Sequence, residues 1–105
     1  MPYFVYVIEL DKTVANIQRF IDENPEYVYG MSCFYVGQTS TSPQERFDQH
    51  LSGYKANRYA KKFGLKLRPG LFRKYNPIGT RENAEYIEQE LATSLRSKGY
   101  GVWCR

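Results

Sequence analysis

The segment that most constrains the fold lies near the start of the chain. Residues 3–10, YFVYVIEL, are rich in aromatic and β-branched residues, which predicts a β-strand, and Glu9 is the only polar residue among them besides the tyrosines. Because apolar residues fall on both faces of this strand, we expect it to lie inside a sheet, with other elements packed on each side. Such a strand requires a layered domain with cover on both faces.

The rest of the chain predicts helices alternating with two more strands. Helices are expected at about residues 13–24, 43–51, 55–63 and 81–98. The start signals are Asp11 or Thr13 for the first helix, Ser42 before Pro43 for the second, and Thr80 for the last. Further strands are expected at 31–37, ended by Gly37, and at 65–75, broken or bent at Pro69-Gly70.

This order predicts an α+β fold, with a small central sheet, mixed or antiparallel, of about three strands flanked by helices. A chain of 105 residues fits one domain, residues 1–105, with a helical insertion at about 12–30 between the first two strands.

Several classes of protein are excluded by composition. No apolar run approaches the roughly 18 residues of a membrane span, and no secretory signal is visible, so we expect a cytoplasmic protein without a membrane partner. Two cysteines do not make a disulfide scaffold, and with one histidine they supply at most three zinc ligands.

Charge is distributed unevenly along the chain. Residues 46–81 carry ten cations and one anion, a net charge of +9, whereas residues 1–45 carry −4. A basic stretch interleaved with aromatic residues indicates a surface for nucleic acid. The expected nucleic-acid-binding residues are Lys55, Arg58, Lys61, Lys62, Lys66, Arg68, Arg73 and Lys74. The alternative is a solvated surface that offsets the acidic first third of the chain.

Glu88 is the unusual residue of the predicted last helix. At about 100° per residue it falls on the apolar stripe of that helix, unlike Glu82, Glu85 and Glu90. A carboxylate facing a core requires a cation, a metal ion or hydrogen-bond donors. Glu88 is therefore either a structural ion-pair partner of an arginine, or a metal ligand or catalytic carboxylate.

Arg46 and His50 lie four residues apart on the second helix and so share one face. Arginine makes bidentate contacts to phosphate, and neutral histidine accepts a proton near neutral pH. The alternative for His50 is a partly buried residue satisfied by a backbone carbonyl.

Taken in order, these residues resemble the GIY-YIG nuclease family. The resemblance covers about residues 4–96. It rests on Phe4-Val5-Tyr6, Tyr35-Val36-Gly37, Arg46, His50 and Glu88. The chain differs from the family pattern in Phe4 at the first glycine, in a long connection between the two tyrosines, and in lacking an asparagine after the last helix.

The resemblance implies hydrolysis of phosphodiester bonds in nucleic acid, with DNA the expected substrate and one divalent metal, Mg²⁺ or alternatively Mn²⁺. It makes Tyr6, Tyr35, Arg46, His50 and Glu88 the catalytic candidates. Glu88 would hold the metal, since Mg²⁺ keeps several waters and needs few carboxylates. Arg46 would hold a phosphate oxygen and Tyr35 would orient water or phosphate.

Tyr6 is the expected general base, with His50 as its relay or as the base itself. DNA and RNA are not distinguished, and a homodimer or a partner that supplies specificity is compatible with a chain of this size. Two other hypotheses remain: a nucleic-acid-binding module of the same fold with weak or no catalysis, and a domain with no role on nucleic acid.

Overall fold

The computed structural model describes residues 1–104, and these contain a single four-stranded sheet. Its strands are β1 (Phe4–Leu10), β2 (Cys33–Thr39), β3 (Gly64–Leu67) and β4 (Gly101–Cys104). The strand order is β3-β1-β2-β4, with β1 antiparallel to both of its neighbours and β2 parallel to β4. The predicted internal position of the first strand is confirmed.

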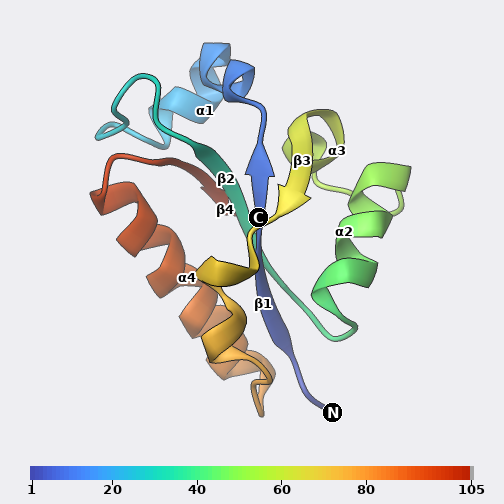
Figure 1. Cartoon of the computed structure of the whole chain (residues 1–105). Coiled ribbons are helices and arrows are strands. Elements are labelled where there is room, and N and C mark those ends of the chain that lie inside the picture. Colours follow the sequence, from blue (N-terminus) through green and yellow to red (C-terminus); the bar gives the residue numbers. More distant parts are fainter. Residues whose placement is uncertain (105) are drawn as a thin grey trace.

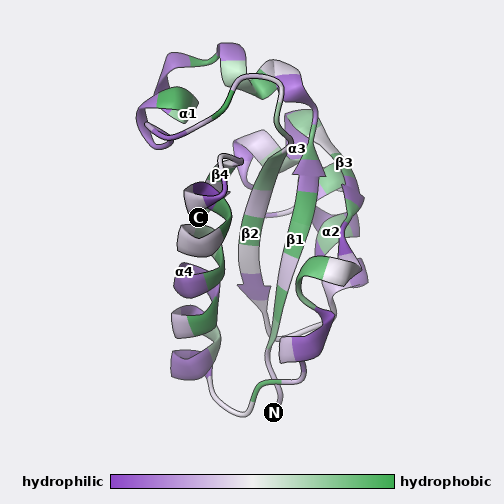
Figure 2. Cartoon of the chain, turned by 60° about the vertical axis from the view of Figure 1, so that its left-hand side comes forward, coloured by the Kyte–Doolittle hydropathy of each residue, from purple (hydrophilic) through white to green (hydrophobic). Residues whose placement is uncertain are grey.

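Helices cover both faces of this sheet. In chain order the helical segments are η1 (Lys12–Asn16), α1 (Gln18–Asp22), α2 (Pro43–Ser52), α3 (Arg58–Phe63), η2 (Pro69–Leu71), η3 (Arg73–Tyr75) and α4 (Arg81–Ser97). Figure 1 shows α4 on one side of the sheet and α2 with α3 on the other. In Figure 2 the hydrophobic side of α4 faces the sheet. The α+β prediction is confirmed, with a mixed sheet.

The strand β4 was not predicted, so the expectation of about three strands is low by one. β4 has only four residues. Its first residue, Gly101, pairs with Cys33 of β2, and a larger side chain would not fit at this position. A Cβ on Gly101 would lie 2.8 Å from Cε1 of Phe20. The buried side chain of Asn24 covers the outer edge of β4, accepting from the Val102 N–H at 2.7 Å and donating to the Val102 carbonyl at 3.0 Å.

The single helix expected at 13–24 is instead the short helices η1 and α1, separated by the extended backbone of Ile17 (φ −90°, ψ 119°). β-branched residues at 13, 14 and 17 lower the helix propensity of this segment. The expected cap is confirmed at Asp11, whose side chain accepts from the Thr13 N–H at 2.9 Å.

Two strand boundaries also differ from expectation. β2 does not end at Gly37 but continues to Thr39, and Gly37 pairs with Tyr6 inside the sheet. β3 ends at Leu67, because Pro69 has no N–H for a further ladder bond and the chain turns into η2 and η3.

Both predicted caps of the longer helices are confirmed. Ser42 Oγ accepts from the Glu45 N–H at 3.1 Å, and Thr80 Oγ1 accepts from the Asn83 N–H at 3.1 Å. Within residues 1–104, every helix is too short or too polar to cross a bilayer.

Candidate active site

Tyr6 and Tyr35 project from neighbouring strands onto the face covered by α2. Tyr6 pairs with Gly37 and Ile8 pairs with Tyr35, so the two tyrosines are diagonal neighbours with ring centroids 6.2 Å apart. The Tyr6 ring passes over Gly37, where a Cβ would lie 2.5 Å from Tyr6 Oη. Because Gly37 has no side chain, the Tyr6 ring can cross β2 at this position.

His50 lies beneath the two phenols with no exposed surface. Phe47 anchors α2 on the core, which places His50, one turn further on, against the sheet. Nε2 lies 2.9 Å from Tyr6 Oη, and Nδ1 accepts the backbone N–H of Asn57 at 3.1 Å. Burial, helped by the Arg46 charge, lowers the pKa of His50 to about 4, so the ring is neutral at pH 7.

Arg46 is held by the loop that follows its own helix. Nη1 donates to Gln49 Oε1 at 3.1 Å and to the Tyr54 carbonyl at 3.2 Å, and Nη2 donates to the Lys55 carbonyl at 2.7 Å. These bonds use three of the five guanidinium donors. The Nε–H and one Nη2–H remain, which form one bidentate edge suited to a phosphate.

Glu88 lines the same pocket from α4, the helix on the opposite side of the sheet from α2 (Figure 1). It is 4% exposed, on the face of α4 that packs Ala84, Leu91 and Ala92 into the core. The pairing of β2 with β4 is described as far as Val36 and Cys104, and Gln38 lies two residues further along β2. A pocket of about 270 Å³ lies there, lined by Tyr6, Tyr35, Gln38, Arg46, Arg81, Glu85 and Glu88.

Electrostatics couple these groups. Burial raises the pKa of Tyr35 to about 12, with the Glu88 charge as the second cause. Burial also raises the pKa of Tyr6 above its ordinary value, reinforced by Tyr35 and opposed by Arg46. Glu88 acts in the same direction on both phenols, so all four groups influence one another.

The five predicted catalytic residues are therefore brought together: four line the pocket and His50 supports Tyr6 from beneath. Sequence reasoning missed Gln38, Arg81 and Glu85. Glu85 lies three residues before Glu88, a spacing that places both on one side of a helix, but its position falls outside the apolar stripe that singled out Glu88. Arg81 Nε donates to Glu85 Oε2 at 3.3 Å.

The donor set fits a hard divalent cation. Two carboxylates, Glu85 and Glu88, line the pocket, and no group of three or more His, Cys, Asp or Glu residues suited to a metal occurs among residues 1–104. Mg²⁺ binds proteins through one or two carboxylates, with waters and phosphate oxygens filling the remaining positions. Glu88, the more buried of the two, is the residue that would hold it.

The predicted nucleic-acid-binding residues are not among those that line this pocket, although the backbone of one of them, Lys55, contacts Arg46. Seven of the eight are exposed: Lys55, Arg58, Lys61, Lys62, Lys66, Arg73 and Lys74. They lie on the α2–α3 loop, α3, β3 and η3. Arg68 differs, because its Nη1 donates to Glu9 Oε1 at 3.0 Å.

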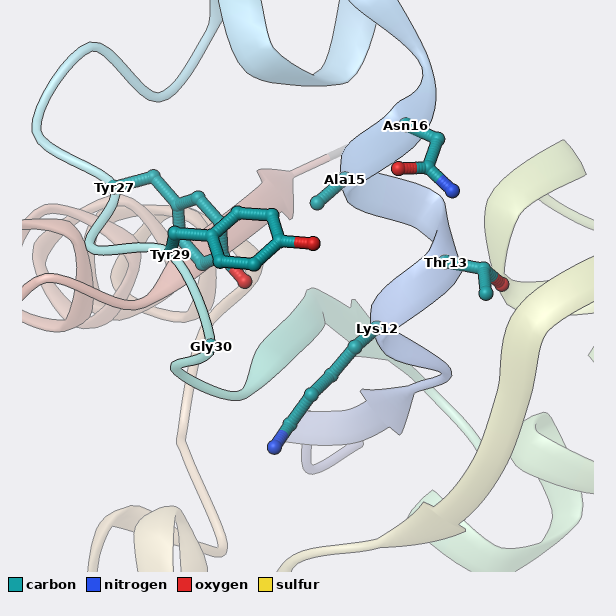
Figure 3. Close-up of a pocket in the computed structure, with 7 residues that line it drawn as sticks. All are labelled: Lys12, Thr13, Ala15, Asn16, Tyr27, Tyr29 and Gly30. Atoms are coloured by element: carbon teal, nitrogen blue, oxygen red, sulfur yellow. The ribbon is translucent and has the colours of Figure 1, made fainter.

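A different hollow lies in the segment between β1 and β2 (Figure 3). It is lined by Lys12, Thr13, Ala15, Asn16, Tyr27, Tyr29 and Gly30. It offers an ammonium, hydroxyls and an amide, but neither a carboxylate nor an imidazole. The chemistry of a hydrolase is therefore better matched by the pocket at Glu88.

Comparison with known proteins gives one match. The family model described as the GIY-YIG catalytic domain matches residues 2–101. No curated protein and no solved structure matches the chain. The matched range includes all five residues that converge at the pocket.

Proposed function

Because the chain belongs to the GIY-YIG catalytic domain family, a domain of nuclease type, we propose that it is a metal-dependent endonuclease that hydrolyses phosphodiester bonds in DNA. One observation carries the proposal. A buried carboxylate, an arginine with an unused bidentate edge and two phenols line one pocket.

Arg46 binds the scissile phosphate in this mechanism. Three loop and helix contacts fix its guanidinium, so its remaining edge is already oriented when the substrate arrives. A donor fixed in advance stabilises the charge that builds on a non-bridging oxygen as water attacks. A divalent cation held by Glu88 would neutralise phosphate charge and lower the pKa of coordinated water.

His50 acts as a fixed donor to Tyr6. Because Nδ1 accepts the Asn57 N–H, the neutral ring carries its hydrogen on Nε2 and donates it to Tyr6 Oη. In this tautomer the one basic lone pair of the ring, on Nδ1, accepts the Asn57 N–H, so none is available to take a proton from water. The ring does stabilise a phenolate on Tyr6, so Tyr6 is the general base and His50 positions it.

Tyr35 lines the same pocket and has the role of orienting water or phosphate. The exposed cations of the α2–α3 loop, α3, β3 and η3 track the nucleic-acid backbone through contacts that do not depend on sequence. A homodimer or a partner protein would add the target preference that such contacts lack.

The test is nicking of supercoiled plasmid with Mg²⁺, with Mn²⁺ and with a chelator. We expect metal-dependent nicking by the wild type and loss of at least 100-fold in Glu88→Gln. Glu90→Gln is the matched control, because it removes an exposed carboxylate from the same helix. Failure of the wild type to cut plasmid, single strands, branched DNA or RNA with either metal would overturn the proposal.

The second candidate function is a nucleic-acid-binding module without turnover. Phe4 at the first glycine position and the lack of an asparagine in residues 98–104 favour it. It predicts steeply salt-dependent binding and no metal-dependent product. Cleavage that is abolished by Arg46→Ala would exclude it.

A further inference from the structure

A second polar hollow lies on the far side of the loop that holds Arg46. It has a volume of about 370 Å³ and is lined by Arg19, Ala56, Asn57, Arg58, Tyr59 and Trp103. Its two cations come from α1 and α3, segments far apart in the sequence. None of its lining residues is acidic.

The two arginines have no carboxylate partner in residues 1–104, where the ion pairs are Arg68 with Glu9 and Arg81 with Glu85. Two guanidinium groups that share a hollow repel one another unless an anion joins them. Their planar donor forks suit a phosphate better than a point charge would.

Tyr59, which lines the hollow, carries an unsatisfied buried hydroxyl. Its side chain is 2% exposed, and its hydroxyl is the one buried side-chain polar atom without a hydrogen-bond partner across residues 1–104. Buried hydroxyls are normally satisfied. This oxygen has almost no accessible surface, so a ligand in the hollow would reach it only after a movement of the Tyr59 ring.

The hollow is adjacent to the catalytic pocket. Trp103 pairs with Tyr35 across β4 and β2, so both side chains lie on the same face of neighbouring strands, which are about 4.8 Å apart. Asn57, another lining residue, donates its N–H to His50. Residues that line the two pockets are therefore neighbours at two places, Tyr35 beside Trp103 and Asn57 beside the His50 that contacts Tyr6.

We propose that this hollow is a second phosphate subsite, in which Arg19 and Arg58 bind a backbone phosphate of the strand being cut. The inference rests on the proposed function for its substrate, DNA. It also assigns a role to the segment between β1 and β2, which supplies Arg19. A cation in the acidic first third of the chain thus joins the substrate-binding surface.

The sole tryptophan of the chain provides a local readout, because Trp103 lines the hollow. We would titrate the protein with the single-stranded tetranucleotide (dT)4 in chelator, which prevents cleavage, and record Trp103 fluorescence. The wild type should show a saturable change. Arg19→Gln and Arg58→Gln should each weaken it by about 3- to 10-fold and reduce the salt dependence by about one counterion.

Lys98→Gln is the control, because it removes the same charge from the end of α4, outside the hollow. Circular dichroism establishes that each variant is folded. If both arginine variants bind as the control does, the subsite is wrong, even where the wild type cleaves DNA. If they lose binding while no metal supports cleavage, the subsite holds and the nuclease proposal fails. Tight binding of (rU)4 but not (dT)4 would overturn the DNA assignment.

Discussion

The Tyr6 hydroxyl and His50 Nε2 lie 2.9 Å apart in the core, and the direction of their hydrogen bond is set from the opposite side of the imidazole by the Asn57 N–H. One ring thereby connects β1 to the loop that precedes α3. His50 is therefore important for stability as well as for the position of Tyr6.

His50→Ala should destabilise the protein by about 3 kcal/mol. The substitution leaves a cavity and deprives both the Tyr6 hydroxyl and the Asn57 N–H of a partner in a buried region. His50→Gln, whose amide replaces one of these bonds, should cost about half as much. Equilibrium unfolding in urea measures both changes. An alanine variant within about 0.5 kcal/mol of wild type would contradict the packing described here.

Stability should fall in mild acid because of the same residue. Burial and Arg46 lower the pKa of His50 from 6.5 to about 4. Above pH 6.5 the ring is neutral in both folded and unfolded chains, so it has no effect. As the pH falls from 6.5 to 4, the unfolded chain binds a proton that the folded chain does not.

The free energy of unfolding should therefore decrease by up to about 3 kcal/mol across that range. Other groups also titrate there, so the measurement is the difference between wild type and His50→Gln in urea at each pH. That difference, about 1.5 kcal/mol in favour of the wild type above pH 6.5, should shrink as the pH falls and reverse its sign as the pH approaches 4. A constant difference would show that His50 titrates normally.

Gly37→Ala should disrupt the pocket. A Cβ at this position would lie 2.5 Å from Tyr6 Oη and 2.7 Å from Cζ, so the Tyr6 ring has to move. We expect a loss of about 1 to 3 kcal/mol in stability, as for other overpacked cores, and a larger relative loss in cleavage rate. Gly70→Ala is the control, since nothing lies within 4 Å of its added Cβ. Equal effects of the two substitutions would contradict the steric role of Gly37.

Local signals predicted much of this fold. Caps at Ser42 and Thr80 located two helices, and the apolar pattern of residues 3–10 located the internal strand. β4 was not predicted, because a strand of four residues is too short to show a clear alternation of apolar and polar residues. Its edge is completed by Asn24, a residue 78 positions away from Val102. Such long-range hydrogen bonds leave no pattern in the neighbouring sequence.

The site residues were predictable where their spacing in the sequence determines which face of a helix they occupy. Arg46 and His50 share a helix face, and Glu88 lies on an apolar stripe, so both placements followed from helical period. Glu85 and Gln38 were missed because the pocket they line forms where α4 packs beside β2, a long-range contact that local spacing does not reveal. The role of His50 depends on a bond from the Asn57 backbone, which side-chain identities do not reveal.

The rate of DNA cleavage should rise with pH if Tyr6 is the base. Its pKa is raised above the ordinary value of 10.0, so only a small fraction of Tyr6 is ionised near neutrality. That fraction grows tenfold for each pH unit, and the rate at saturating Mg²⁺ should grow by about the same factor between pH 6 and 8.5. A histidine base with a pKa of about 4 would instead give a flat profile above about pH 5.

Two matched variants separate the phenols. Tyr6→Phe keeps the ring over Gly37 and removes only Oη, so the rate should drop by about 100-fold or more and lose its dependence on pH. Tyr35→Phe should lower the rate less and keep the slope, because Tyr35 orients groups without accepting the proton. Single-turnover cleavage of a labelled duplex at five pH values measures all three proteins. If the cleavage rate of Tyr6→Phe still rises with pH, another group accepts the proton. If the cleavage rate of the wild type does not change with pH, neither tyrosine is the base.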